Sequence, residues 1–311
     1  MMIPFPSKND ILLAMKNDVF YKSQALIGGT IFKNGSWVNR HTGGYAMVFP
    51  FTTADGQKIV VRCWFFDIGN SKKRMLAIMT ELTKLNCPYF VNLVYHDDAL
   101  LINGVLQPVV TMDYVEDPTL KDYIKENIND RSAILKVAEN FRLMVQFFHQ
   151  NNIAHGDLSH GNIKVKNDGS LVVIDYDSMY VQELNGMPDI IKGLSGYQHP
   201  ARHDNNNINP KLDYFSELVI YLSLLVFADY KIMWEEYCET EDLLFSKQDY
   251  ESPSTSKLFA QLTKSTNLQI SDLTTKLVDC LNYNDICHLK PLEEMLKNKL
   301  DDLANSIIDK F

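Results

Sequence analysis

The pattern of this chain changes character once, near Pro118. Before that point, short runs rich in β-branched and aromatic residues are separated by turn residues, which is typical of strands. After that point, apolar residues recur mostly at helical spacing. The order predicts an α+β fold with two lobes, a small β-rich lobe followed by a larger helical lobe. A cleft between two such lobes is the natural place for a ligand.

In the β-rich part, one helix is expected over residues 71–85, because its apolar residues keep to one face. A short amphipathic helix is expected within residues 8–24, ahead of the main pattern. The expected strands cover residues 37–38, 45–51, 58–64, 99–103 and 107–115, the last two joined by a turn at Asn103-Gly104.

In the helical part, a strong helix is expected over residues 131–151, and the apolar segment 214–228 indicates a helix buried on all sides. A short hairpin is expected over residues 163–166 and 171–175. The chain is therefore divided into an N-terminal extension, a small lobe and a large lobe, which cover residues 1–30, 31–115 and 116–311.

Composition excludes several classes of partner. The net charge of −9 over 311 residues argues against nucleic acid as a partner. No signal peptide is expected in residues 1–10, and the apolar run 218–228 is too short to span a membrane. The five cysteines form no C-x-x-C pair, and their odd number together with the lack of a secretion signal favours reduced thiols and a cytoplasmic protein. No membrane partner is expected.

The sharpest motif is the loop His155-Gly156-Asp157-Leu158-Ser159-His160-Gly161-Asn162, followed by Ile174-Asp175-Tyr176-Asp177 at the end of an apolar strand. It resembles the catalytic loop and metal-binding loop of the protein kinase superfamily, H-R-D-L-x-x-x-N and D-F-G. The form of the motifs looks like an atypical branch of bacterial eukaryotic-like Ser/Thr protein kinases. The H-G-D form of the loop also occurs in aminoglycoside and choline phosphotransferases, which share the fold.

The resemblance implies a role for each matched residue. The carboxylate of Asp157 orients the acceptor hydroxyl and takes its proton. Asp175 and Asn162 hold a divalent metal, Mg²⁺ or Mn²⁺, which neutralises charge on ATP. His155 holds the loop, and Asp213 caps the buried helix and anchors the catalytic loop.

The nucleotide-binding residues are also carried over from the resemblance. His41, Gly43, Gly44 and Val48 lie where the family has its glycine-rich loop, of which only Gly43 matches a family glycine. Arg62 stands in place of the family's phosphate-binding lysine, and it either pairs with Glu81 on the next helix or lacks that partner. Adenine would meet the hinge segment formed by Met112, Asp113 and Val115.

Further departures concern regulation and the substrate groove. Gly156 replaces the arginine of H-R-D, so we expect no requirement for a phosphorylated activation segment, and a switching phosphosite between residues 178 and 195 would contradict this. Ser159 replaces a lysine that steadies the transferring phosphate. Ala201 stands where the family's A-P-E motif has its glutamate.

Three functions remain open from the sequence. The first is an ATP- and metal-dependent protein kinase that acts on Ser or Thr of an unknown protein substrate. The second is a small-molecule phosphotransferase, supported by His155-Gly156-Asp157. The third is a pseudokinase that acts as a binding or scaffolding module, supported by Arg62 and the degenerate glycine loop, although a pure scaffold has no need of Asp175.

Overall fold

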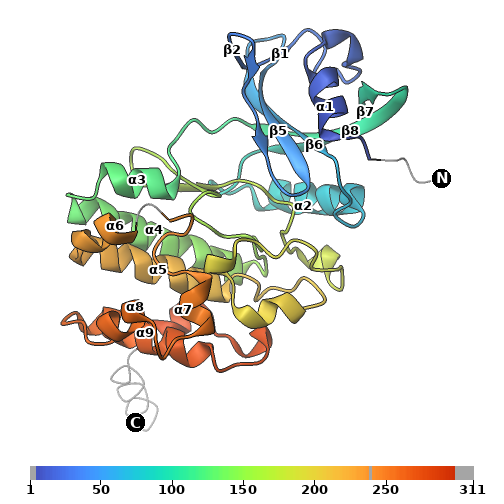
Figure 1. Ribbon diagram of the computed structural model, residues 1–311. Helices are drawn as coiled ribbons and strands as arrows, with labels where there is room; N and C mark the ends of the chain where they lie inside the picture. Colours follow the sequence, from blue (N-terminus) through green and yellow to red (C-terminus); the bar gives the residue numbers. More distant parts are fainter. Residues whose placement is uncertain (1–4, 238–239, 298–311) are drawn as a thin grey trace. The chain divides into compact units, whose positions relative to one another are not determined.

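Contacts within the chain divide it into two compact units, Met1–Glu116 and Asp117–Phe311. The computed structural model describes residues 5–237 and 240–297. The first unit contains a curled antiparallel sheet and the second is mainly helical, which confirms the expected α+β class (Figure 1). Among the described residues, no helix combines the length and apolar character needed to cross a membrane.

The first unit is built on a sheet with the strand order β1-β5-β6-β8-β7, and β4 pairs with Met47 and Val48 near the start of β5. β2 and β3 form a separate two-stranded hairpin. The strands are β1 (Thr30–Ile31), β2 (Lys33–Asn34), β3 (Trp37–Val38), β4 (His41–Thr42), β5 (Ala46–Thr52), β6 (Lys58–Trp64), β7 (Leu93–Ile102) and β8 (Val105–Asp113).

The β7–β8 hairpin shows where the sequence pattern was hard to interpret. Its turn is Asn103-Gly104 as expected, with φ of 51° and 79°, the left-handed backbone that Asn-Gly supplies readily. β7, however, begins at Leu93 rather than at residue 99. A register shift between His96 and Leu100 interrupts the ladder, and polar residues at this irregularity hide the strand alternation.

Residues ahead of the sheet belong to the core of the first unit. Helix α1 (Lys8–Met15) starts with a capping box made by Ser7 and Asp10 and is followed by the 3₁₀ turn η1 (Asp18–Phe20), so it is shorter than expected. Ile11 and Met15 are fully buried in one apolar cluster with sheet residues. The N-terminal extension therefore supplies part of this core.

Helix α2 (Ser71–Leu85) has the bounds expected from the sequence. Its apolar face is buried, but so is Arg74, whose Nε donates to the carbonyl oxygens of Ile68 and Gly69. Periodicity of apolar residues could not reveal a buried arginine, because its burial depends on carbonyl groups that precede the helix.

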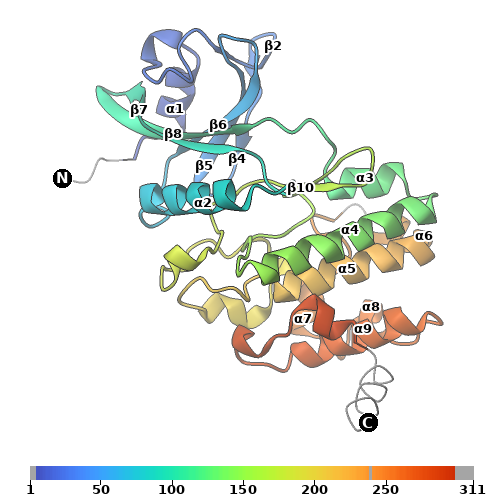
Figure 2. The same cartoon turned by 180° about the vertical axis from the view of Figure 1, so that it is seen from behind.

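The second unit is organised around the long helices α4 and α5, which pack side by side in both views (Figure 1 and Figure 2). The buried stripe of α4 consists of seven apolar residues at helical spacing, and α5 is buried almost throughout. The helices are α3 (Leu120–Glu126), α4 (Arg131–Gln150), α5 (Tyr214–Asp229), α6 (Lys231–Tyr237), α7 (Lys247–Glu251), α8 (Lys257–Leu262), α9 (Leu268–Cys280) and α10 (Leu292–Met295). The short hairpin consists of β9 (Ile163–Val165) and β10 (Leu171–Val173).

A histidine links three of these helices. His149 Nε2 lies 2.8 Å from Glu217 Oε1, and Nδ1 lies 2.9 Å from Glu293 Oε2. Burial lowers the pKa of His149, but the hydrogen bonds and charges of the two glutamates outweigh it and raise the pKa to about 9. Burial also raises the pKa of Glu217. Because both ring nitrogens face carboxylates, the geometry favours a doubly protonated ring.

This site predicts how stability depends on pH. The folded-state pKa of His149 lies above its unfolded value near 6.5, so the ionic contribution is fully present below pH ~6.5 and is lost as pH rises toward 9. We expect the free energy of unfolding to fall by roughly 1–3 kcal/mol across this window. Denaturant titrations at several pH values should show a flatter dependence for His149→Gln. The exposed-site control His203→Gln should keep the wild-type slope, and equal slopes in all three proteins would contradict the assignment.

Candidate functional site

The loop that carries Asp157 is anchored by the carboxylate of Asp213. Asp213 is 1% exposed and lies at the start of α5. Its Oδ2 accepts the amide of His155, and its Oδ1 accepts the amide of Gly156 at 2.9 Å. The expected anchoring contact is thus present, but the expected helix cap is wrong, since the side chain makes no capping bond to α5.

His155 completes the support of this loop. The side chain is fully buried, its Nε2 lies 2.9 Å from the carbonyl oxygen of Ile174, and its Nδ1 accepts the amide of Asp157 at 3.3 Å. One ring therefore ties the catalytic loop to the residue that precedes Asp175, in agreement with the supporting role expected for His155.

Gly156 is required by the path of the chain. Its φ is +78°, and a Cβ there would lie 2.3 Å from the carbonyl oxygen of Ser178. Ser178 is close because Ala154 and Tyr180 pair in an antiparallel bridge. The glycine that replaces the family's arginine is therefore the residue that lets the two segments meet at this point.

Three predicted catalytic residues converge in this unit. Asn162 Nδ2 donates to Asp157 Oδ2 at 3.2 Å and to the Asp157 carbonyl oxygen at 2.8 Å. The carbonyl of Asn162 accepts the amide of Ile174 at 3.0 Å, which places the loop beside Asp175. Asp175 has φ of +69°, an uncommon backbone conformation for an aspartate that is often found at functional sites.

The environment of Asp157 tunes its charge. Burial and then the nearby carboxylate of Asp175 raise the pKa of Asp157 to about 7, against the lowering effects of Arg202, the Leu194 amide and Asn162. A carboxylate whose pKa lies near neutral pH is well suited to accept a proton in catalysis.

The donor set fits a hard divalent cation. Asp175 supplies a carboxylate, and Asn162 has its amide oxygen remaining once its nitrogen is bound to Asp157. Mg²⁺ typically takes one or two protein oxygens and completes its shell with water and phosphate oxygens. In the part of the chain that the structure describes, no group of three or more His, Cys, Asp or Glu residues could hold a metal alone.

In the first unit, several of the residues predicted to bind the nucleotide share one face of the sheet. Val48, Arg62 and Val110 are direct neighbours across β5, β6 and β8, and Met112 pairs with Val60 in the next row of the same face. Arg62 is only 7% exposed, so it is not a surface charge on an exposed strand. Glu81 Oε1 lies 3.2 Å from Lys84 Nζ within α2.

The predicted glycine loop is the tip of the β4–β5 hairpin. His41 pairs with Val48, and the amide of Gly43 donates to the carbonyl of Ala46 at 3.0 Å. Gly43 and Gly44 are exposed and neither has a positive φ. The turn does not require a glycine backbone conformation at either position. The two glycines instead leave the main chain uncovered by side chains.

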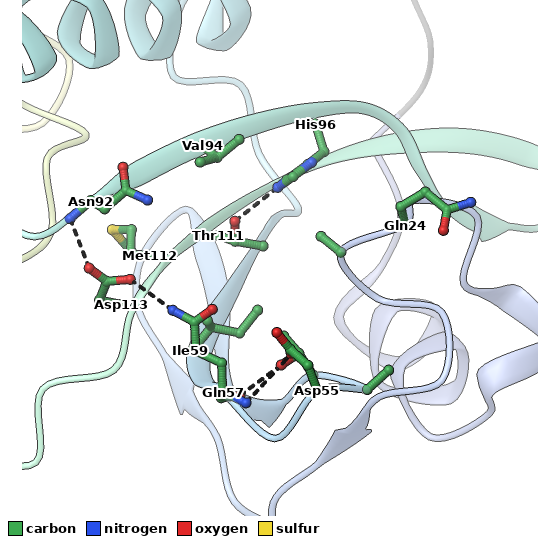
Figure 3. A pocket seen from close by; sticks show the side chains of 13 residues that line it. Gln24, Asp55, Gln57, Ile59, Asn92, Val94, His96, Thr111, Met112 and Asp113 are labelled. Atoms are coloured by element: carbon green, nitrogen blue, oxygen red, sulfur yellow. Dashed lines mark hydrogen bonds between the residues drawn. The ribbon is translucent and has the colours of Figure 1, made fainter.

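The end of β8 contains the predicted hinge residues Met112 and Asp113, and Val115 follows it. The Asp113 carboxylate is used locally, since it accepts the Asn92 amide at 3.3 Å and the Gln57 side chain at 3.4 Å. It lines a hollow of about 400 Å³ together with Ile59 and Thr111 (Figure 3). Ile59, Thr111 and Asp113 alternate with Val60 and Arg62, so their side chains lie on the opposite face of the sheet, although Met112 also lines the hollow.

Sequence reasoning missed an ion pair that holds residues 189–205. Arg202 is 1% exposed, and its Nε and Nη2 donate to the Asp189 carboxylate at 3.3 and 3.2 Å. Its Nη1 donates to Gln198 Oε1. The available signal in the sequence was this arginine, which directly follows Ala201, the position of the family's glutamate. Its partner Asp189 lies thirteen residues earlier, so adjacent residues do not reveal the pair.

His160 has a packing role. Its Nδ1 is hydrogen-bonded to the hydroxyl of Tyr197. Burial and then the charge of Lys121 lower the pKa of His160 to about 4, against the raising effect of Asp122. The ring is therefore neutral at physiological pH and joins the catalytic loop to the segment that contains Gln198.

Comparisons with known proteins find sequence similarity to protein kinases. The protein kinase domain family matches residues 42–289. Similar curated proteins include a probable serine/threonine-protein kinase zyg-1 of Caenorhabditis briggsae, 26% identical over 40% of this chain and 17% of its own length. The inhibitor of nuclear factor kappa-B kinase subunit alpha of Gallus gallus is 24% identical over 58% of this chain and 26% of its own length. The serine/threonine-protein kinase CST20 of Candida albicans is 23% identical over 48% of this chain and 12% of its own length. The chain thus spans only a part of each of these relatives.

The role of Gly156 yields a direct prediction. Gly156→Ala should lower the free energy of unfolding by at least about 2 kcal/mol, because it adds a side chain at positive φ and against the Ser178 carbonyl. Gly161→Ala is the matched control, since no atom lies closer than 4.0 Å to its added Cβ. Denaturant unfolding measures both variants, and an equal loss of stability in the two would contradict the account.

Proposed function

This chain belongs to the protein kinase domain family, and we propose that it transfers the γ-phosphate of ATP to a serine or threonine hydroxyl of a protein. The observation that carries the proposal is the convergence of Asp157, Asn162 and Asp175, with Asp157 hydrogen-bonded to Asn162 and electrostatically coupled to Asp175. The chain spans only part of its relatives, so its substrate is proposed here at the level of the acceptor group alone.

The reaction needs few groups from the protein. The acceptor hydroxyl oxygen forms a bond to the γ-phosphorus, the bond to the β,γ-bridging oxygen breaks, and ADP leaves. Asp157 orients the hydroxyl and accepts its proton. Asp175 and Asn162 hold Mg²⁺ or Mn²⁺, which neutralises charge on the phosphates when bound.

Nucleotide binding is assigned to residues of the first unit. Arg62 contacts phosphate oxygens with a permanently charged, bidentate donor, as lysine does in the family with a single ammonium group. The exposed main chain at Gly43 and Gly44, with His41 and Val48 beside it, approaches the phosphates. The main-chain groups of Asp113 and Val115 meet the adenine edge, with Met112 behind the base.

Regulation follows from the loop structure. The backbone of residues 178–180 packs against Gly156, and the Arg202–Asp189 pair already holds the following segment. These contacts support activity without phosphorylation of the activation segment.

The placement in a bacterial branch and in the cytoplasm also stays a prediction, and the relatives named above come from eukaryotes.

Transfer of radiolabelled phosphate from ATP tests the function. With Mg²⁺ and generic protein acceptors such as casein, we expect phosphoserine or phosphothreonine to form. Asp157→Asn should lower the rate about 10²–10⁴-fold because the proton acceptor is lost. The exposed-carboxylate control Asp97→Asn, which removes a surface ion pair with Lys72, should keep wild-type activity.

The other outcomes point to different functions. Phosphorylation of an aminoglycoside or choline, with none of any protein, would overturn the protein kinase assignment in favour of a small-molecule phosphotransferase. Binding of ATP without transfer to any acceptor would overturn it in favour of a pseudokinase. Unchanged activity in Asp157→Asn would remove the proposed base.

A further inference from the structure

Gln198 has a buried amide whose orientation is fixed at one end only. Gln198 is 7% exposed, and its Oε1 accepts a hydrogen bond from Arg202 Nη1. Arginine can only donate, so the amide oxygen must face Arg202 and the NH₂ group must point elsewhere. Gln198 Nε2 is buried and has no hydrogen-bond partner within the described chain.

Asp157 has the complementary feature. Its Oδ2 accepts a hydrogen bond from Asn162, whereas Oδ1 is buried and accepts no hydrogen bond within the described residues, although the Leu194 amide is near enough to lower the pKa of Asp157. Leaving a buried acceptor unpaired is costly, and leaving a buried donor unpaired nearby doubles the cost. Few such atoms are expected in a native structure. An unpaired donor and an unpaired acceptor in one place therefore indicate that the two groups interact with each other.

Gly193 shows how close the two atoms are. A Cβ built on Gly193 would lie 2.5 Å from Asp157 Oδ1 and 2.9 Å from Gln198 Nε2. The donor and the acceptor therefore lie no more than about 5.4 Å apart, the sum of these two distances. Gly193 has φ of +74°, and the absence of a side chain leaves both atoms against its bare Cα. A hydrogen bond between them requires a separation of about 3 Å, which rotation of the Gln198 side chain about its own bonds would have to provide.

We infer that Gln198 is a positioning residue for Asp157, whose Oδ1 it holds through Nε2, while Oδ2 accepts from Asn162 and keeps a second lone pair for the acceptor hydroxyl. This inference rests on the proposed phosphoryl transfer. The ion pair between Arg202 and Asp189 sets the position of Gln198, so the segment 189–202 helps to aim the catalytic carboxylate. Ser159, two residues after Asp157, is uncharged and cannot supply an ionic contact there.

Two substitutions separate positioning from simple packing. Gln198→Glu keeps the length and the oxygen that Arg202 binds, but it replaces the donor that faces Asp157 with an acceptor. Gln198→Met keeps the approximate volume and removes both polar atoms. If Gln198 only supports Arg202, Gln198→Glu is tolerated, and if Nε2 positions Asp157, Gln198→Glu is at least as harmful as Gln198→Met.

Kinetics give the first readout. Both variants should lower kcat about 10–100-fold while the KM for ATP stays within about twofold, because Gln198 acts on the carboxylate rather than on nucleotide binding. Gln248→Glu, a change of the same type on the exposed surface of α7, should leave kcat unchanged. Wild-type kcat in Gln198→Glu would overturn the inference.

A double-mutant cycle on thermal unfolding gives a readout that needs no activity. Gln198→Glu should lower the unfolding midpoint of the wild type by several degrees, since two carboxylates then face each other. The same change in the Asp157→Asn background should cost much less. Additive effects would overturn the contact. If the cycle shows coupling but the protein transfers no phosphate, the proposed function and the catalytic role of Gln198 are both overturned. The contact between the two side chains would still stand.

Discussion

The candidate site depends first on one buried carboxylate, that of Asp213. It accepts the amides of two successive loop residues, His155 and Gly156, and so fixes the backbone immediately before Asp157. Burial raises the pKa of Asp213, with a further raising effect from Glu217, while His155, Arg202 and the Gly156 amide lower it. A charged group in such a position is retained only when its hydrogen bonds are satisfied, which here requires the loop to keep its observed path.

That path explains the residues around it. The loop backbone can meet the segment at Ser178 only if residue 156 has no side chain, so an arginine at this position is incompatible with the fold as it stands. The same unit gathers Asp157 and Asp175, whose mutual repulsion is a cost to stability. Arg202 relieves part of this repulsion, and a bound cation would relieve more. A strained arrangement of acids is a common property of sites that bind metal and nucleotide.

Much of this could be predicted from the sequence, for identifiable reasons. Helices α2 and α4 follow local periodicity, and their bounds agree with the prediction to within one residue. The Asp157 loop was identifiable because its residues are adjacent in the sequence. Buried polar pairs were not: Arg202 and Asp189 meet only through the fold, and Arg74 is buried by carbonyl groups outside its own helix. Asp213 was correctly placed at the loop, but local capping rules gave its side chain the wrong partner.

We propose that this chain binds ATP through a metal held by Asp175 and Asn162. Thermal unfolding with ATP, with and without Mg²⁺, tests it most directly. At about 100 times the dissociation constant, a ligand stabilises the folded state by about 2.7 kcal/mol, which corresponds to a shift of several degrees. We expect a shift that requires Mg²⁺ and is lost in Asp175→Asn. No shift with any metal, or an equal shift in Asp175→Asn, would contradict it.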